Sequence, residues 1–193
     1  MFNVVVFASG KGSNLKSIFE KVSKEKIKIC AVVSDKKDSG AVQFAVENRI
    51  PIFLLSDNNE PGMYNYSKLS RQLKKIPTDL IVLAGFLKKL SDEFVDKFEN
   101  RIINIHPALL PLFGGKGMYG MKVHKTVFES KAKYSGVTVH FVDKIYDHGK
   151  IIAQKVIDVS DAQSAEEIAQ RVLVVEHELL PEIVEKFANG KVL

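Results

Sequence analysis

Apolar residues in the first half of the chain fall into short continuous runs, which are separated by segments with helical spacing. The runs rich in β-branched residues, each expected to form a strand, span 3–8, 27–34, 52–55 and 79–86. The intervening segments, each expected to form a helix, span 15–22, 41–48, 64–75 and 91–98. Unbroken apolar runs are typical of strands that are covered on both faces of a sheet.

The second half adds three predicted strands, over 101–107, 137–142 and 151–159, and one long predicted helix over 164–188. The helix carries an apolar stripe that is expected to pack in the core: Ile168, Val172, Val175, Leu179, Ile183 and Phe187. Pro181 predicts a kink or a break in it. The alternation predicts an α/β fold: a Rossmann-like, doubly wound, mostly parallel sheet of about seven strands flanked by helices, with its first strands in the order 3-2-1-4.

One predicted strand presents two polar side chains together. Because alternate residues of a strand face the same way, Ile103 and Ile105 are expected to pack in the core while Asn104 and His106 share the other face. Pro107 predicts that the strand ends with His106 at its tip, where open α/β sheets bind ligands. An amide donor beside an imidazole suits a reaction in which a carbonyl oxygen gains negative charge. Two strand-end residues satisfied by the backbone are an equally good interpretation of this motif alone.

A glycine-rich turn, Ser9-Gly10-Lys11-Gly12-Ser13-Asn14, joins the first predicted strand to the first predicted helix. Such a turn points backbone N–H groups and the positive end of the helix dipole at a ligand, and glycine lets a phosphate approach closely. The spacing is not that of a Walker A loop, and Leu15 occupies the third glycine position of the dinucleotide fingerprint. We therefore expect a phosphate site without a dinucleotide; a glycine turn with no ligand is the alternative.

Length, charge and cysteine content narrow the class of protein. A chain of 193 residues suits one domain with a single core. The net charge of +5 comes from scattered lysines rather than from a basic stripe interleaved with aromatic residues, so no nucleic-acid partner is expected. The single cysteine, Cys30, excludes an intramolecular disulfide and is expected to be a core residue. No apolar run approaches ~20 residues and no signal peptide is apparent, so we expect a soluble, cytoplasmic protein with no membrane partner.

Five motifs, taken together in this order and spacing, resemble those of the phosphoribosylglycinamide formyltransferases, which belong to the folate-dependent formyltransferase superfamily. They lie at 10–14, at 83–86, at 104–111, at 137–142 with Asp147 and Gly149, and at 171–177. The resemblance covers essentially the whole chain, and the five motifs are far more specific together than any one of them is alone.

The resemblance implies transfer of a formyl group from the co-substrate 10-formyltetrahydrofolate to the amine of 5′-phosphoribosylglycinamide in de novo purine biosynthesis, with neither a metal nor a nicotinamide cofactor. The family's catalytic positions match Asn104, His106 and Asp147. Its ribonucleotide-binding positions match Gly12, Ser13, Asn14 and Glu176, and its folate-binding positions match Leu87, Lys88, Lys89, Leu90 and Asn104. Residues 1–193 would form one domain, with 1–100 as the phosphate- and nucleotide-binding half and 101–193 as the catalytic and folate-binding half, in a monomer or a homodimer.

Direct attack of the substrate amine on the formyl carbonyl is expected, because no serine or cysteine stands in a setting that activates a nucleophile. The tetrahedral intermediate would be held by Asn104 and a protonated His106, with Asp147 raising the pKa of the imidazole. An ordinary Asp-x-Gly turn is the alternative for Asp147.

The remaining histidines are expected to have lesser roles: His140 in support of the site or the structure, and His124, His148 and His177 at the surface or in packing. The segment 112–121 is longer and richer in glycine than the family's common form, and His148-Gly149-Lys150 replaces the more usual Gly-Gly-Pro. We expect Gly114–Gly120 to be mobile and to cover the folate side; a surface loop without a ligand is the alternative.

Other functions remain open on fold alone. They are formyl transfer to another acceptor, such as methionyl-tRNA or water, a noncatalytic nucleotide-binding module, and an NAD-dependent oxidoreductase.

Overall fold

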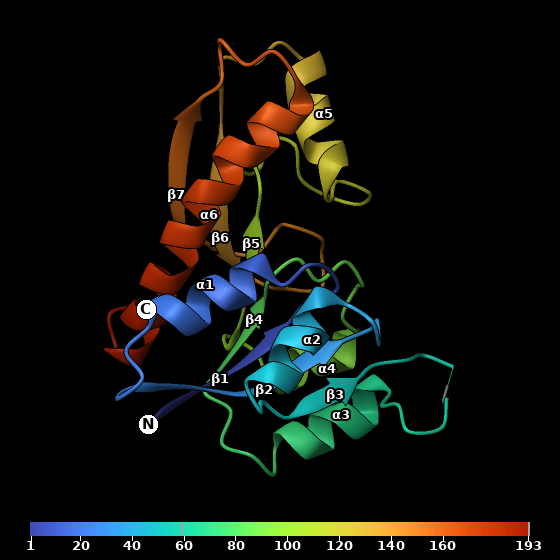
Figure 1. Cartoon of the computed structure of the whole chain (residues 1–193). Helices are drawn as coiled ribbons and strands as arrows, with labels where there is room; N and C mark the ends of the chain where they lie inside the picture. Colours follow the sequence, from blue (N-terminus) through green and yellow to red (C-terminus); the bar gives the residue numbers. More distant parts are fainter. Residues whose placement is uncertain (59, 193) are drawn as a thin grey trace.

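The computed structural model describes residues 1–58 and 60–192, which form one seven-stranded sheet with helices on both faces (Figure 1). The strand order is β3-β2-β1-β4-β5-β6-β7. The pairs among the first five strands are parallel, whereas β5 with β6 and β6 with β7 are antiparallel. The predicted fold class is confirmed, including the strand order 3-2-1-4.

The strands are β1 (Phe2–Phe7), β2 (Ile27–Ser34), β3 (Ile52–Leu54), β4 (Leu80–Leu83), β5 (Ile102–His106), β6 (Tyr134–Phe141) and β7 (Ile151–Asp158). The helices are α1 (Ser13–Lys21), α2 (Gly40–Glu47), α3 (Tyr66–Leu73), α4 (Asp92–Lys97), α5 (Met121–Glu129) and α6 (Ala165–Ala188). Among the described residues, no helix combines the length and the apolar character needed to cross a membrane.

The central strand β1 is buried on both faces, as its unbroken apolar run predicts. Val4 and Val6 pack with apolar side chains of α1, α2, α5 and α6, whereas Val5 and Phe7 pack with those of α3 and α4. We call these two sides the α6 face and the α3 face. On β5, Ile103 and Ile105 both lie on the α6 face, which confirms the predicted alternation.

The strand register brings the carboxyl ends of the central strands to one level. Phe7 of β1 pairs with Leu83 of β4, and Leu83 pairs with Asn104 of β5. The chain leaves β1 for α1 on one face and β4 for α4 on the other, so a crevice opens at this edge of the sheet.

Three expectations about the elements need correction. Helix α5 was not predicted, although Val123 and Val127 are fully buried one turn apart, because the glycine-rich segment before it has no helical pattern. Strand β6 begins at Tyr134 rather than at residue 137. Cys30 is only half-buried, at the margin of the core; burial still raises the pKa of its thiol.

Helix α6 continues through Pro181, so the alternative of a break there is wrong. Proline has no N–H to donate to the carbonyl four residues earlier, which is that of His177. That carbonyl instead accepts hydrogen bonds from Ser17 Oγ at 2.6 Å and Lys21 Nζ at 3.0 Å. Helix α1 therefore satisfies the group that the proline leaves free. The predicted apolar stripe of α6 does pack in the core.

Candidate functional site

A cavity of about 320 Å³ lies at the carboxyl ends of the central strands. All of the residues proposed from the sequence for the site line it: Gly12, Ser13, Asn14, Leu87, Lys88, Lys89, Leu90, Asn104, His106, Asp147 and Glu176. The structure thus brings residues from α1, β5, α6 and three loops to one place. A cavity of this size, with a few converging polar groups, is typical of a small-molecule site.

The glycine turn leaves the first amides of α1 without a capping side chain. Helices α2, α3, α4 and α6 each begin at a Ser or Asn side chain that accepts an N–H of the first turn, but α1 begins at Gly12, which has no such group. Gly12 has a φ of 75°, and a Cβ there would lie 2.8 Å from the Cα of Ala41. The turn therefore requires glycine, and it presents a helix N-terminus suited to an anion.

Beside this turn lies a buried polar pair. Asn14 Nδ2 donates a hydrogen bond to Glu176 Oε2 at 2.8 Å, and the two residues are 7% and 8% exposed. Burial raises the pKa of Glu176 to about 7, and the bond from Asn14 offsets only part of this effect. Among the described residues, Asn14 Oδ1 is buried with no hydrogen-bond partner. This end of the cavity therefore holds an unused acceptor and a carboxyl group that is partly protonated at neutral pH.

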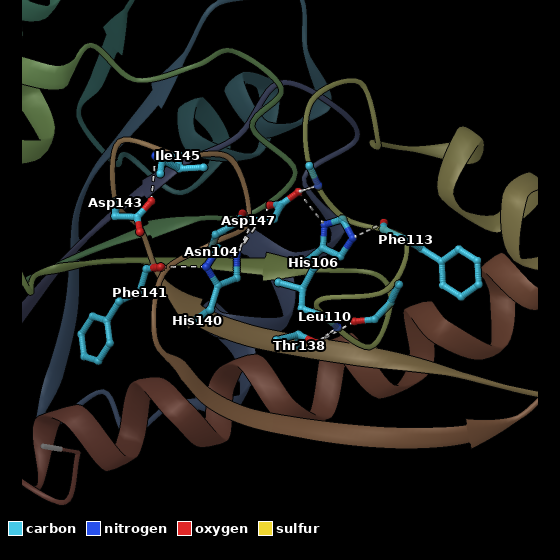
Figure 2. A network of polar contacts seen from close by, with 12 residues as sticks. Asn104, His106, Leu110, Phe113, Thr138, His140, Phe141, Asp143, Ile145 and Asp147 are labelled. Carbon is cyan, nitrogen blue, oxygen red and sulfur yellow. Dashed lines mark hydrogen bonds and ion pairs between the residues drawn. The ribbon is translucent and has the colours of Figure 1, made fainter.

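Asn104 is oriented by His140, its neighbour across the β5–β6 pair (Figure 2). His140 Nδ1 donates to the carbonyl of Phe141 at 2.7 Å, and because a carbonyl oxygen can only accept, this nitrogen carries a proton. His140 Nε2 then accepts an N–H from Asn104 Nδ2 at 3.1 Å. Since an amide has two N–H groups, Asn104 keeps a second one for a ligand in the cavity.

His106 is held between a carbonyl and a carboxylate. Its Nε2 donates to the carbonyl of Phe113 at 2.9 Å, and its Nδ1 lies 3.6 Å from Asp147 Oδ2 (Figure 2). Burial lowers the pKa of His106, and Asp147 and the Phe113 carbonyl only partly oppose this effect. The lowered pKa favours the neutral ring at pH 7, with Nδ1 able to accept a proton; a protonated His106 in the tetrahedral intermediate stays a prediction.

Asp147 is ionised although it is largely buried. Burial raises its pKa, but contacts with His140, His106 and the Gly115 amide outweigh that effect, and the net pKa lies below its ordinary value. The Gly115 N–H donates to Asp147 Oδ2 at 2.9 Å, and His140 Nε2 lies 3.6 Å from Oδ1. Asp147 also has a φ of 53°, a left-handed conformation that aspartate tolerates better than most residues.

The segment that follows His106 is anchored from beneath by Thr138. Its Oγ1 donates to the Ala108 carbonyl at 2.6 Å and accepts the Leu110 N–H at 3.0 Å. Gln154 Nε2 donates to both Thr138 Oγ1 and the Leu110 carbonyl, at 2.9 Å each. These contacts hold the start of the glycine-rich segment, so that the backbone of Phe113 and Gly115 reaches the two ionisable side chains.

The segment Leu87–Leu90 lies on the α3 face of the cavity. Ser9 Oγ accepts the Leu87 N–H at 3.3 Å, and Tyr66 OH donates to the Lys89 carbonyl at 2.9 Å. Lys88 forms an ion pair with Asp57 at 2.5 Å. The segment is thus fixed by the ends of β1 and α3.

The remaining histidines differ in their surroundings. His148 is exposed and bonds to Asp143 at 2.9 Å, and His177 is partly buried in packing, as predicted. His140, predicted to have a supporting role, contacts both Asn104 and Asp147. His124, predicted to lie at the surface or in packing, is 7% exposed and lines the cavity. Sequence reasoning missed its place because it missed α5.

Residues 2–184 match the formyl transferase family, so the chain belongs to that family. This membership confirms the resemblance seen in the sequence motifs.

Several relatives of this chain have a name that is more specific than that of the family. The phosphoribosylglycinamide formyltransferase of Bacillus subtilis (strain 168) is 33% identical over 96% of this chain and 94% of its own length. The chloroplastic protein of that name from Vigna unguiculata is 44% identical over 98% of this chain, but the chain spans only 62% of that protein's length. The crystal structure of phosphoribosylglycinamide formyltransferase from Anaplasma phagocytophilum is similar, with a TM-score of 0.88, 32% identity, and coverage of 98% of this chain and 88% of that one.

Proposed function

We propose that this chain transfers a formyl group from 10-formyltetrahydrofolate to the amine of 5′-phosphoribosylglycinamide, in purine biosynthesis. The observation that carries the proposal is the meeting of Asn104, His106 and Asp147 in one cavity, which also contains the uncapped N-terminus of α1. The family membership and the names of the relatives support the choice of acceptor and donor.

The substrate amine attacks the formyl carbonyl directly. As the carbonyl oxygen gains negative charge, the free N–H of Asn104 donates a hydrogen bond to it, and His140 holds the amide in that orientation. The nitrogen that forms the new bond loses a proton, which the neutral His106 accepts at Nδ1. The Asp147 carboxylate, 3.6 Å away, then stabilises the imidazolium. Collapse of the intermediate breaks the bond to the folate nitrogen, which takes the proton from the His106 imidazolium, so that tetrahydrofolate leaves and His106 is neutral again.

The other sequence-predicted residues are proposed to bind the substrates. The phosphate lies on the amides of Gly12, Ser13 and Asn14, Glu176 holds the ribose, and Leu87–Leu90 with Asn104 hold the folate. Residues 1–100 then form the phosphate- and nucleotide-binding half, and 101–193 the catalytic and folate-binding half, of one domain. We propose small molecules as the only partners of this site, in a cytoplasmic monomer or homodimer.

The proposal is tested by an absorbance assay for tetrahydrofolate, with 5′-phosphoribosylglycinamide supplied or withheld. The expected result is release of tetrahydrofolate only when the ribonucleotide is present. Equal release without it would identify a hydrolase, and no release in either case would overturn the proposal. Titration with NAD(H) and with 10-formyltetrahydrofolate in parallel separates formyl transfer from nicotinamide chemistry.

A further inference from the structure

A third imidazole faces the same cavity, and the mechanism above does not use it. His124 lies in the first turns of α5, between Val123, which is fully buried, and the exposed Lys125. Its side chain is 7% exposed and lines the cavity together with Gly117, Met118 and Gly120. A histidine in this position is either a packing residue or a ligand-binding group, and its hydrogen bonds decide between the two.

His124 forms no hydrogen bond with any described residue. Its Nδ1 is buried without a partner, whereas Nε2 is not among the buried unpaired atoms and is therefore the nitrogen left accessible. A buried N–H without an acceptor costs more than a buried lone pair, so the proton is expected on Nε2. Burial, with a smaller contribution from His106, lowers the pKa of His124 to about 4. The side chain thus presents a neutral N–H donor to the cavity.

The location of α5 indicates which substrate this donor meets. Val127 of α5 packs on the α6 face, in one apolar cluster with side chains of α1 and α6, the helices that carry Asn14 and Glu176. Leu90, the last residue of the segment Leu87–Leu90, in contrast packs on the α3 face. Helix α5 also begins without a capping side chain, at Gly120, so its first amides are further donors on the same side. This part of the cavity suits a group rich in acceptor oxygens.

We infer that His124 donates a hydrogen bond from Nε2 to an oxygen of the ribonucleotide, and so serves as a substrate-positioning residue on the α6 face. The inference rests on the proposed function, because it takes the ribonucleotide as the substrate. Phosphate and ribosyl oxygens offer the same acceptor chemistry, and the experiment distinguishes them.

The test compares His124→Leu with His124→Gln in the full-length chain. Leucine removes the donor, whereas the amide of glutamine places an N–H near the position of Nε2. In His124→Leu, KM for 5′-phosphoribosylglycinamide should rise about 10-fold or more, as expected for one lost hydrogen bond to a polar or charged group, with KM for 10-formyltetrahydrofolate unchanged. In His124→Gln, most of that loss should be recovered. Tm should fall in neither variant by more than a few degrees, because leucine removes a buried nitrogen that has no partner.

His177→Leu is the matched control, because His177 also has a buried, unpartnered ring nitrogen but does not line the cavity. It should leave both KM values unchanged.

The effect of inorganic phosphate on Tm identifies which oxygen of the ribonucleotide accepts the hydrogen bond. If phosphate raises the Tm of the wild type but not that of His124→Leu, the acceptor is a phosphate oxygen. If phosphate still raises the Tm of His124→Leu while KM for the ribonucleotide is raised, the acceptor is a ribosyl oxygen. An unchanged KM for the ribonucleotide in His124→Leu, or equal increases for both substrates with no recovery in His124→Gln, would overturn the inference. Inactivity of the unsubstituted protein would instead refute the proposed function.

Discussion

Two carboxylates line the same cavity, and their surroundings shift their pKa values in opposite directions. Glu176 is buried and Asp147 is partly buried, and burial raises the pKa of each. Asp147 lies near two imidazoles and accepts the Gly115 N–H, and together these contacts lower its pKa below the ordinary value. Glu176 has one neutral donor, Asn14, and its pKa stays raised, at about 7. Glu176 is also the more deeply buried of the two, so the depth of burial and the number of donors together set the opposite shifts.

The comparison supports the proposed roles of Asp147 in catalysis and of Glu176 in binding. An ionised Asp147 can stabilise the imidazolium of His106 when that ring accepts a proton. Glu176, whose pKa of about 7 leaves it partly protonated at neutral pH, can donate as well as accept hydrogen bonds, which suits its proposed role of holding ribose hydroxyls.

The largest expected effect comes from removing the groups of the catalytic end. His106→Ala and Asn104→Ala should each lower the transfer rate by about 100-fold or more, by loss of a proton acceptor or of an oxyanion donor. Steady-state rates of the purified variants, with circular dichroism to verify the fold, provide the measurement. Wild-type-like turnover in either variant would contradict its assigned role.

The second-largest effect is expected in the pH dependence of the free energy of unfolding, which Glu176→Gln should change. The pKa of Glu176 is about 7 in the folded protein and about 4.5 in the unfolded chain, so its contribution to stability is full below pH 4.5 and is lost as the pH rises through 7. The loss amounts to at most about 3 kcal/mol. Glutamine cannot ionise, so Glu176→Gln should lack this loss. The free energy of unfolding of the variant, relative to that of the wild type, should therefore be higher at pH 8 than at pH 4.5.

Denaturant titrations at pH 4.5, 6 and 8 measure the free energy of unfolding of the wild type and of Glu176→Gln. The contributions of the other titrating groups cancel in the difference between the two values. Glu178→Gln, an exposed glutamate on the same helix, is the control and should follow the wild type at every pH. If the difference in free energy of unfolding between the wild type and Glu176→Gln is the same at all three pH values, the pKa of Glu176 is not raised and the contrast with Asp147 is wrong.

A smaller effect is expected from the turn that carries Asp147. A Cβ on Gly149 would lie 1.9 Å from the Phe141 carbonyl oxygen. Because this is far too close for two non-bonded atoms, Gly149→Ala must displace the turn from β6. Since a small misplacement near the reacting atoms is costly, transfer should slow by about 10-fold, mainly in kcat. His148→Ala, an exposed neighbour outside the cavity, should retain full activity. Equal kcat values for the two variants would show that the position of Asp147 is not critical.

The sequence predicted the fold and the residues of the cavity because both follow from local patterns. Alternation along β5 separates Ile103 and Ile105 from Asn104 and His106, and the glycine turn between β1 and α1 identifies the helix N-terminus. Register then places these elements side by side.

The surroundings of the reactive groups could not be predicted in this way. The carbonyl of Phe113 and the amide of Gly115 have no side-chain signal, yet they orient His106 and Asp147. The net lowering of the pKa of His106 depends on how deeply the neighbouring segments bury it, which a list of its charged neighbours does not reveal. The position of His124 at the cavity was missed because helix α5 was not predicted.

The smallest expected effect concerns the glycine-rich segment, predicted from the sequence to cover the folate side when substrate is bound. Gly117, Met118 and Tyr119 line the cavity, while the contacts to His106 and Asp147 come from Phe113 and Gly115, which precede them. Deleting residues 116–119 should therefore spare the catalytic groups and admit water, raising the ratio of formyl hydrolysis to transfer by about 3- to 10-fold. Both products are measured in one reaction, and folate affinity by titration. If the ratio and the affinity are both unchanged, the segment is a surface loop without a catalytic role, and water is excluded by the substrates themselves.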